Sequence, residues 1–176
     1  GLFIGDGVGD YYQSAKLLKG QALEAIGDCD RAAPVFADYT KWSDMARESV
    51  SVAERIHFFR GKALPAYLGL IRCMAQIAQS NSSDAAISNL LSSVDLVKSR
   101  QLFELMGVRE EAASISTQEI RGSLGEKSGI LLLQDLETFI LVLVLTRDHT
   151  RLRLIAKPDN WDQKLFSLRD QLAEQG

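Results

Sequence analysis

The segment Phe139–Thr146, which reads FILVLVLT, constrains the fold of this 176-residue chain more than any other segment. It places seven apolar residues in a row. That run is far shorter than the roughly 20 apolar residues that a membrane-spanning helix needs. The segment is rich in leucine, valine and isoleucine, and a turn signal at Asp148-His149 follows it. Its length, composition and flanks therefore predict a strand that is buried on both faces.

Two shorter segments complete a predicted antiparallel sheet around this strand. Residues 130–134 form the first strand candidate, and residues 150–155 form the third. In the third candidate, Arg151 and Arg153 alternate with leucines, a pattern typical of a half-exposed edge strand. These arginines, together with Arg147, either contact an acidic surface of a partner or guard a solvated edge by their charge.

The central strand needs cover on both faces, because both sets of its alternating side chains are apolar. A helix predicted over 160–174 can cover one face through Trp161, Leu165 and Leu168. The other face has only a short helix over 116–124, opened by a capping box, or the last helix of the preceding region. We therefore expect the sheet to belong to a larger α/β domain.

Residues 10–106 are predicted to be helical, after an extended terminus over residues 1–9. Apolar residues recur there with the helical period, and turn signals at Gly27-Asp28 and 81–84 separate the segments. The inward stripe predicted for the first helix consists of Ala15, Leu18, Ala22, Leu23 and Ile26. Further helices are expected from about residue 30, over 43–61, over 62–80 and from about 85 to 106.

The string LLKGQALEAIGDCDRAAPVF has the pattern of two antiparallel helices in close contact. Gly20 lies 12 residues before Ala32, and Phe36 follows one helical turn later. Small residues let the helix axes approach, and the ring fills the remaining gap. The string resembles a tetratricopeptide repeat (TPR), although Lys16 stands at the early Trp position and the closing Pro is absent. Residues 10–106 are thus interpreted as an irregular TPR-like region whose surface binds a protein partner or peptide.

The chain after residue 93 resembles a second family. The string VDLVKSRQLFELMG is similar to the helix that joins such repeats to CHAT domains, the caspase-like peptidase domains of bacteria. STQEIRGSL, GILLLQDL, FILVLVLTRD and TRLRLI then follow in the order of the CHAT entry. The resemblance implies that residues 107–176 are the N-terminal part of a caspase-like α/β domain, with the remaining part of the CHAT domain as a partner. It also implies a Cys–His dyad downstream of residue 176.

No spacing in the chain assembles a catalytic, cofactor-binding or metal site. Cys29 lies in the turn GDCD and Cys73 in the helical string IRCMA, so neither has the loop setting of a caspase nucleophile. His57 falls in a helix and His149 in a hairpin turn, which supplies no Ser–His–Asp or metal set. The string GDGVG at residues 5–9 lacks the preceding strand and the following Lys-Ser or Lys-Thr of a phosphate loop. We predict no catalytic, cofactor or metal residue here.

The charge and the cysteine content limit which partners and which cellular compartment are expected. The net charge is −3, and neither residues 1–107 (11 basic, 12 acidic) nor residues 108–176 (9 basic, 11 acidic) have the basic excess that nucleic acids require. Two cysteines 44 residues apart form no disulfide framework, which is typical of the cytoplasm. The first ten residues do not have the pattern of a signal peptide, and no membrane association is expected.

The sequence thus predicts a mostly α fold with a small β part: TPR-like repeats followed by the first strands and helices of a caspase-like domain. The predicted function is the non-catalytic repeat-to-protease junction of a bacterial CHAT cysteine peptidase, which binds a protein partner and scaffolds the peptidase domain. One alternative is a TPR-type interaction adaptor without peptidase activity. Another is a sensor that binds a small ligand on its concave repeat surface.

Overall fold

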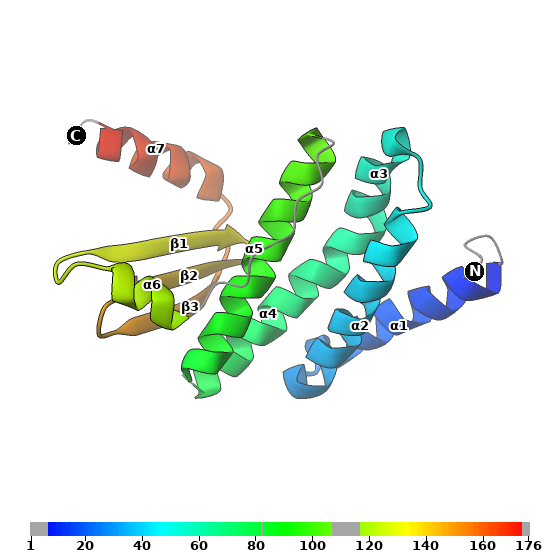
Figure 1. Cartoon of the computed structure of the whole chain (residues 1–176), viewed down its shortest axis with the longest axis horizontal. Helices are drawn as coiled ribbons and strands as arrows, with labels where there is room; N and C mark the ends of the chain where they lie inside the picture. The colour runs from blue at the N-terminus through cyan, green and yellow to red at the C-terminus, as the bar shows by residue number, and fades with distance from the viewer. Residues whose placement is uncertain (1–6, 82, 107–116, 174–176) are drawn as a thin grey trace.

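The structure is a computed structural model, and it describes residues 7–81, 83–106 and 117–173 (Figure 1). Its elements in chain order are the helices α1 (Gly7–Ala25), α2 (Cys29–Arg47) and α3 (Val52–Phe58), the π-helical turn η1 (Phe59–Ala63), the helices α4 (Leu64–Asn81), α5 (Asp84–Met106) and α6 (Thr117–Ser123), the strands β1 (Gly129–Asp135), β2 (Phe139–Thr146) and β3 (Thr150–Ala156), and the helix α7 (Trp161–Ala173). The described chain is mostly helical with a small antiparallel sheet, as predicted.

Two helix boundaries differ from the predicted ones. Helix α1 begins at Gly7, so residues 7–9 are helical instead of extended, and the rest of that predicted terminus lies outside the described residues. Helix α2 extends to Arg47, so the start of the helix predicted over 43–61 belongs to α2. The predicted domain boundary at 106/107 adjoins residues 107–116, which also lie outside the described part.

The break predicted near Gly61 is absent, because α3 continues through η1 into α4. The backbone N–H of Leu64 donates to the carbonyl of Phe59, five residues back, which is the π-helical pattern. Pro65 is the second residue after this turn. Since proline has no N–H to donate, a local change of hydrogen-bond register lets the helical path pass through it.

The apolar stripe predicted for α1 is largely wrong. Leu18 and Ile26 are 64% and 75% exposed, whereas Gly20 and Leu23 are buried and Leu17 packs against the same core. Helix α1 lies at the outer end of the helical layer (Figure 1) and packs on α2 and α4 with one side. The side of α1 that faces inward is the one that carries the small residue Gly20, which allows close approach to Phe36.

The ring of Phe36, which is fully buried, fills the space where α1, α2 and α4 meet. A Cβ added at Gly20 of α1 would lie 2.8 Å from its Cε1 atom. A Cβ added at Gly69 of α4 would lie only 2.5 Å from its Cζ atom. The predicted contact of Gly20 with Phe36 is therefore confirmed, and Ala32 is buried in the same cluster. Gly69 is a third participant that the repeat pattern did not reveal.

Strand β2 is the central strand, as predicted, and it pairs antiparallel with β1 on one side and β3 on the other. Its side chains Leu141 and Leu143, with Leu152 of β3, join the core formed by α4 and α5. This face is thus covered by the last two long helices. The main core of the molecule is shared between the helices and the sheet, and so the two predicted domains are packed into one body.

The second face of the sheet does not receive the cover expected from α7. Leu165 of α7 is 39% exposed, Trp161 is half-buried, and the side chain of Leu168 lies outside the described part. On the sheet, Leu131 and Ile155 are 58% and 49% exposed. The helix itself lies where it was predicted, but the sequence pattern does not specify which neighbour it meets.

Candidate functional site

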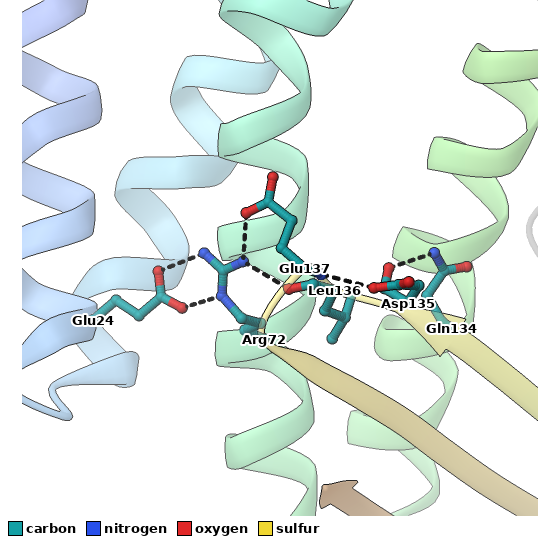
Figure 2. A network of polar contacts seen from close by, with 6 residues as sticks. All are labelled: Glu24, Arg72, Gln134, Asp135, Leu136 and Glu137. Carbon is teal, nitrogen blue, oxygen red and sulfur yellow. Dashed lines mark hydrogen bonds and ion pairs between the residues drawn. The ribbon is translucent and has the colours of Figure 1, made fainter. Parts of the chain in front are cut away.

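The most developed polar site lies where α1 and α4 meet the turn between β1 and β2 (Figure 2). Glu24 comes from the last turn of α1 and Arg72 from the middle of α4, and residues 135–137 form the turn. Together we call these residues the Arg72 junction. It connects segments that are more than 60 positions apart in sequence, because Arg72 donates to the carbonyl of Leu136.

Arg72 holds Glu24 through two hydrogen bonds. Its Nη2 lies 3.1 Å from Oε2 of Glu24, and its Nε donates to Oε1 of the same carboxylate. Both side chains are largely buried, at 15% and 16% exposure. Burial acts to lower the pKa of Arg72, but hydrogen bonding to Glu24 and the charge of that carboxylate outweigh it, so the pKa lies above its ordinary value. The guanidinium is therefore a permanent charge with fixed geometry.

The same guanidinium reaches the sheet. Its Nη1 donates to the carbonyl oxygen of Leu136 at 3.4 Å and lies 3.9 Å from Oε2 of Glu137. The Leu136 side chain is fully buried in the core shared by the helices and the sheet. Leu136 thus holds the turn in two ways: its side chain is buried in the core, and its carbonyl accepts from the Arg72 guanidinium.

Asp135 fixes the shape of the turn. Its Oδ1 accepts from the backbone N–H of Glu137 at 2.9 Å, and its Oδ2 pairs with Lys157. Glu137 has a φ of 70°, in the left-handed region that non-glycine residues adopt at a cost of roughly 1–2 kcal/mol. The backbone N–H of Leu136 donates to the carbonyl of Phe139 at 2.8 Å, which closes the turn. The junction therefore orients a strained turn against two helices.

The Arg72 junction links the helices α1 and α4 to the β1–β2 turn by directional hydrogen bonds. A planar guanidinium with paired donors binds a carboxylate in one orientation, so a shift of α1 or of the turn breaks bonds instead of stretching them. No nucleophile or acid–base pair takes part in it among the contacts described. The site is suited to coupling the position of the helices to that of the sheet.

Sequence reasoning missed this junction, although one signal was present. Arg72 is the single charged residue in the string LPAYLGLIRCMAQIAQSN of α4. A lone charge in an apolar helix needs a partner when it is buried. The partner, Glu24, could not be identified from sequence, because nothing in the repeat pattern places the end of α1 beside the middle of α4.

The structure brings the two cysteines together. Cys29 begins α2, Cys73 lies in α4, and both thiols are buried, free and within hydrogen-bonding reach of each other. Cys29 also donates to Oε1 of Gln76 at 3.0 Å. Burial raises the pKa of both thiols, most strongly that of Cys73. The thiolate, which is the reactive form, is therefore suppressed at both positions.

We expect neither cysteine to react with an iodoacetamide probe in the folded protein at pH 8. Because each pKa lies above that of a free thiol, the thiolate fraction at a given pH is smaller, and burial blocks access as well. Mass spectrometry should show modification that is slow in buffer and complete in denaturant. Fast labelling of Cys29 or Cys73 in the native protein would contradict this assignment.

The two histidines considered in the sequence analysis lie on different elements and form no common site. His57 lies exposed on α3, and His149 lies exposed in the β2–β3 turn, where its carbonyl accepts from the backbone N–H of Thr146. No group of three His, Cys, Asp or Glu side chains is placed to hold a metal ion within the described ranges. Over the same ranges, none of the helices combines the length and the apolar character that crossing a bilayer takes.

Comparisons with models of protein families, with curated proteins and with solved structures find no match for this chain. Its resemblance to TPR repeats and to the CHAT entry therefore rests on the sequence strings and stays a prediction.

Proposed function

We propose that this chain is a non-catalytic interaction scaffold in the cytoplasm, the repeat-to-protease junction of a bacterial CHAT-type cysteine peptidase. Helices α1–α5 bind a protein partner or peptide, and they hold the sheet of the following α/β domain. The observation that carries the proposal is the Arg72 junction, with its bonds from Arg72 to Glu24 of α1 and to Leu136 of the β1–β2 turn. Such bonds suit a module that sets the position of an attached domain.

The helical part offers a surface for a partner. A groove of about 450 Å³ between α1 and α2 is lined by Tyr12, Lys16, Lys19, Pro34, Val35 and Asp38. Tyr12 is 63% exposed, and the ammonium group of Lys16 lies 5.4 Å from the centre of its ring. Lys16 is already paired with Asp38, whereas Lys19 is exposed. The exposed ring of Tyr12 and the exposed Lys19 beside an apolar floor favour a peptide that carries both apolar and acidic side chains.

A TPR-type adaptor without peptidase activity is the second candidate. It is favoured by two exposed apolar side chains, Leu18 of α1 and Ile26 directly after that helix. Both lie far along the chain from the sheet and are available to a protein partner. In that function the sheet has a structural role only.

The full-length gene product separates the two candidates. The CHAT function predicts a His and a Cys after successive strands beyond residue 176, and cleavage of a fluorogenic peptide library that is abolished when that Cys becomes Ala. Cys29→Ala and Cys73→Ala are the matched controls and should leave cleavage unchanged. If the gene product has no such pair and binds partners without cleavage, the adaptor function holds and the peptidase proposal is wrong.

A further inference from the structure

A groove of about 600 Å³ runs along the free edge of β3, away from the Arg72 junction and from the groove between α1 and α2. Residues from α4, α5, α6, β2 and β3 line it, among them Ala78, Ile87, Arg121, Val144, Arg151 and Leu152. Consecutive residues of a strand point to opposite faces. Since Arg151, Leu152 and Arg153 all line the groove, it passes around the edge of β3. It also reaches the sheet face that carries Val142 and Val144 of β2, the partners of Arg153 and Arg151 in the ladder.

The main chain of β3 presents hydrogen-bonding groups to this groove. The β2–β3 hairpin is closed by a bond from the N–H of Thr146 to the carbonyl of His149, at 2.9 Å. Hydrogen-bonded pairs alternate with non-bonded pairs along an antiparallel ladder. Counted from that closing pair in the observed register, the main-chain groups of Leu152 and Leu154 point away from β2.

These outward groups are weakly occupied. The carbonyl of Leu152 accepts from Nε2 of Gln79 at 3.5 Å and from Nη1 of Arg153 at 3.3 Å. The backbone N–H groups of Leu152 and Leu154 have no hydrogen-bond partner among the described residues. Unpaired donors on an edge strand are a template for an added strand, and bonds as long as 3.5 Å are easily exchanged.

The side chains around this edge have a definite charge pattern. Arg151 and Arg153 are exposed on one side and form no ion pair with any carboxylate in the described part of the chain. Arg121 donates to Oγ1 of Thr150 at 2.6 Å and is paired with Asp84 at 3.2 Å, so its charge is already compensated. Its buried Nε has no partner in the described part. On the other side, the wall toward α4 and α5 consists of buried Ala78 and Ile87 together with the polar Gln79.

We propose that the free edge of β3 binds an extended acidic segment of a partner protein, which adds to the sheet as a fourth strand. Carboxylates at alternate positions of that segment lie beside Arg151 and Arg153. The apolar side chains between them face Ala78 and Ile87. Main-chain bonds supply general affinity, and the arginines select acidic segments. This site is separate from the repeat surface and does not depend on the peptidase proposal.

Fluorescence anisotropy with defined peptides tests the proposal. The probe is a labelled, terminally blocked peptide of sequence EVEVEV, compared with KVKVKV. We expect the protein to bind EVEVEV, and Arg151→Glu/Arg153→Glu to weaken that binding by at least about tenfold, because two attractive charge pairs become repulsive. Arg147→Glu is the matched control: Arg147 is exposed in the same hairpin but does not line the groove, and its change should leave the affinity within about twofold.

N-methylated probes separate strand addition from simple charge attraction. One probe carries methyl groups on the three valine nitrogens and the other on the three glutamate nitrogens, so each blocks one edge of the peptide. If the peptide adds as a strand, one methylated probe should lose at least about tenfold in affinity, and the other should bind like unmethylated EVEVEV. Absence of EVEVEV binding overturns the proposal, as does equal behaviour of the two methylated probes. Binding that survives the double charge reversal overturns it as well.

Discussion

Phe36→Ala should lower the free energy of unfolding by about 3–5 kcal/mol, because it removes a fully buried ring from a close-packed site. The two glycines that touch the ring limit how far the space can collapse. Both meet the ring through their backbones, and neither has a side chain to move into the gap. Urea denaturation followed by circular dichroism measures the change.

The same contact can be tested by adding volume instead of removing it. Gly69→Ala would place a methyl group 2.5 Å from the Phe36 ring, so the ring or α4 has to move, at a cost of about 1–3 kcal/mol. Leu18→Ala on α1 is the control, since Leu18 is 64% exposed and its loss should change stability by no more than about 0.5 kcal/mol. Equal stability of all three variants would contradict the packing described for the repeat pair.

Arg72→Met should lower the free energy of unfolding by about 3 kcal/mol, near the lower end for breaking a buried ion pair. The reason is the carboxylate left behind: Glu24 is 16% exposed and would lose its bidentate partner. Met retains much of the apolar volume of the arginine stem, so the effect reports the charge and the hydrogen bonds.

A double-mutant cycle isolates this pair. Glu24→Leu/Arg72→Met should be less destabilised than the sum of the two single variants, with a coupling of about 1–3 kcal/mol. Arg31→Met is the control, because Arg31 pairs with Asp28 at an exposed site with 71% of its side chain accessible and should change stability by about 0.5 kcal/mol or less. An additive cycle would mean that Arg72 and Glu24 are neighbours without an energetic connection.

The positions and the order of the strands could be predicted from sequence, because their signals are local. Alternation places Leu141, Leu143 and Leu145 on one face of β2, and the turn lies at 147–148, one residue before the predicted Asp148-His149. A turn of the same length, at residues 137–138, joins β1 to β2. Helix existence was equally clear, since caps and periodicity are also local.

Several features could not be predicted, because they depend on which surfaces meet. The passage of the helix through Gly61 and Pro65 depends on a π-helical turn that has no reliable local signal. The inward side of α1 depends on Phe36 and Gly69, which belong to other helices. The Arg72 junction had a local warning, a lone charge in an apolar helix, but its partners come from α1 and from the sheet.

We expect the helices and the sheet to unfold as one cooperative body, because α4 holds the β1–β2 turn. Hydrogen exchange of backbone amides at increasing urea concentration tests it directly, with residues 139–146 of β2 and residues 68–78 of α4 as the two reporters. We expect the amides of both segments to exchange through the same global unfolding, with equal free energies of opening and equal dependence on urea. Exchange of the β2 amides through a separate opening of lower free energy, while α4 remains protected, would contradict it.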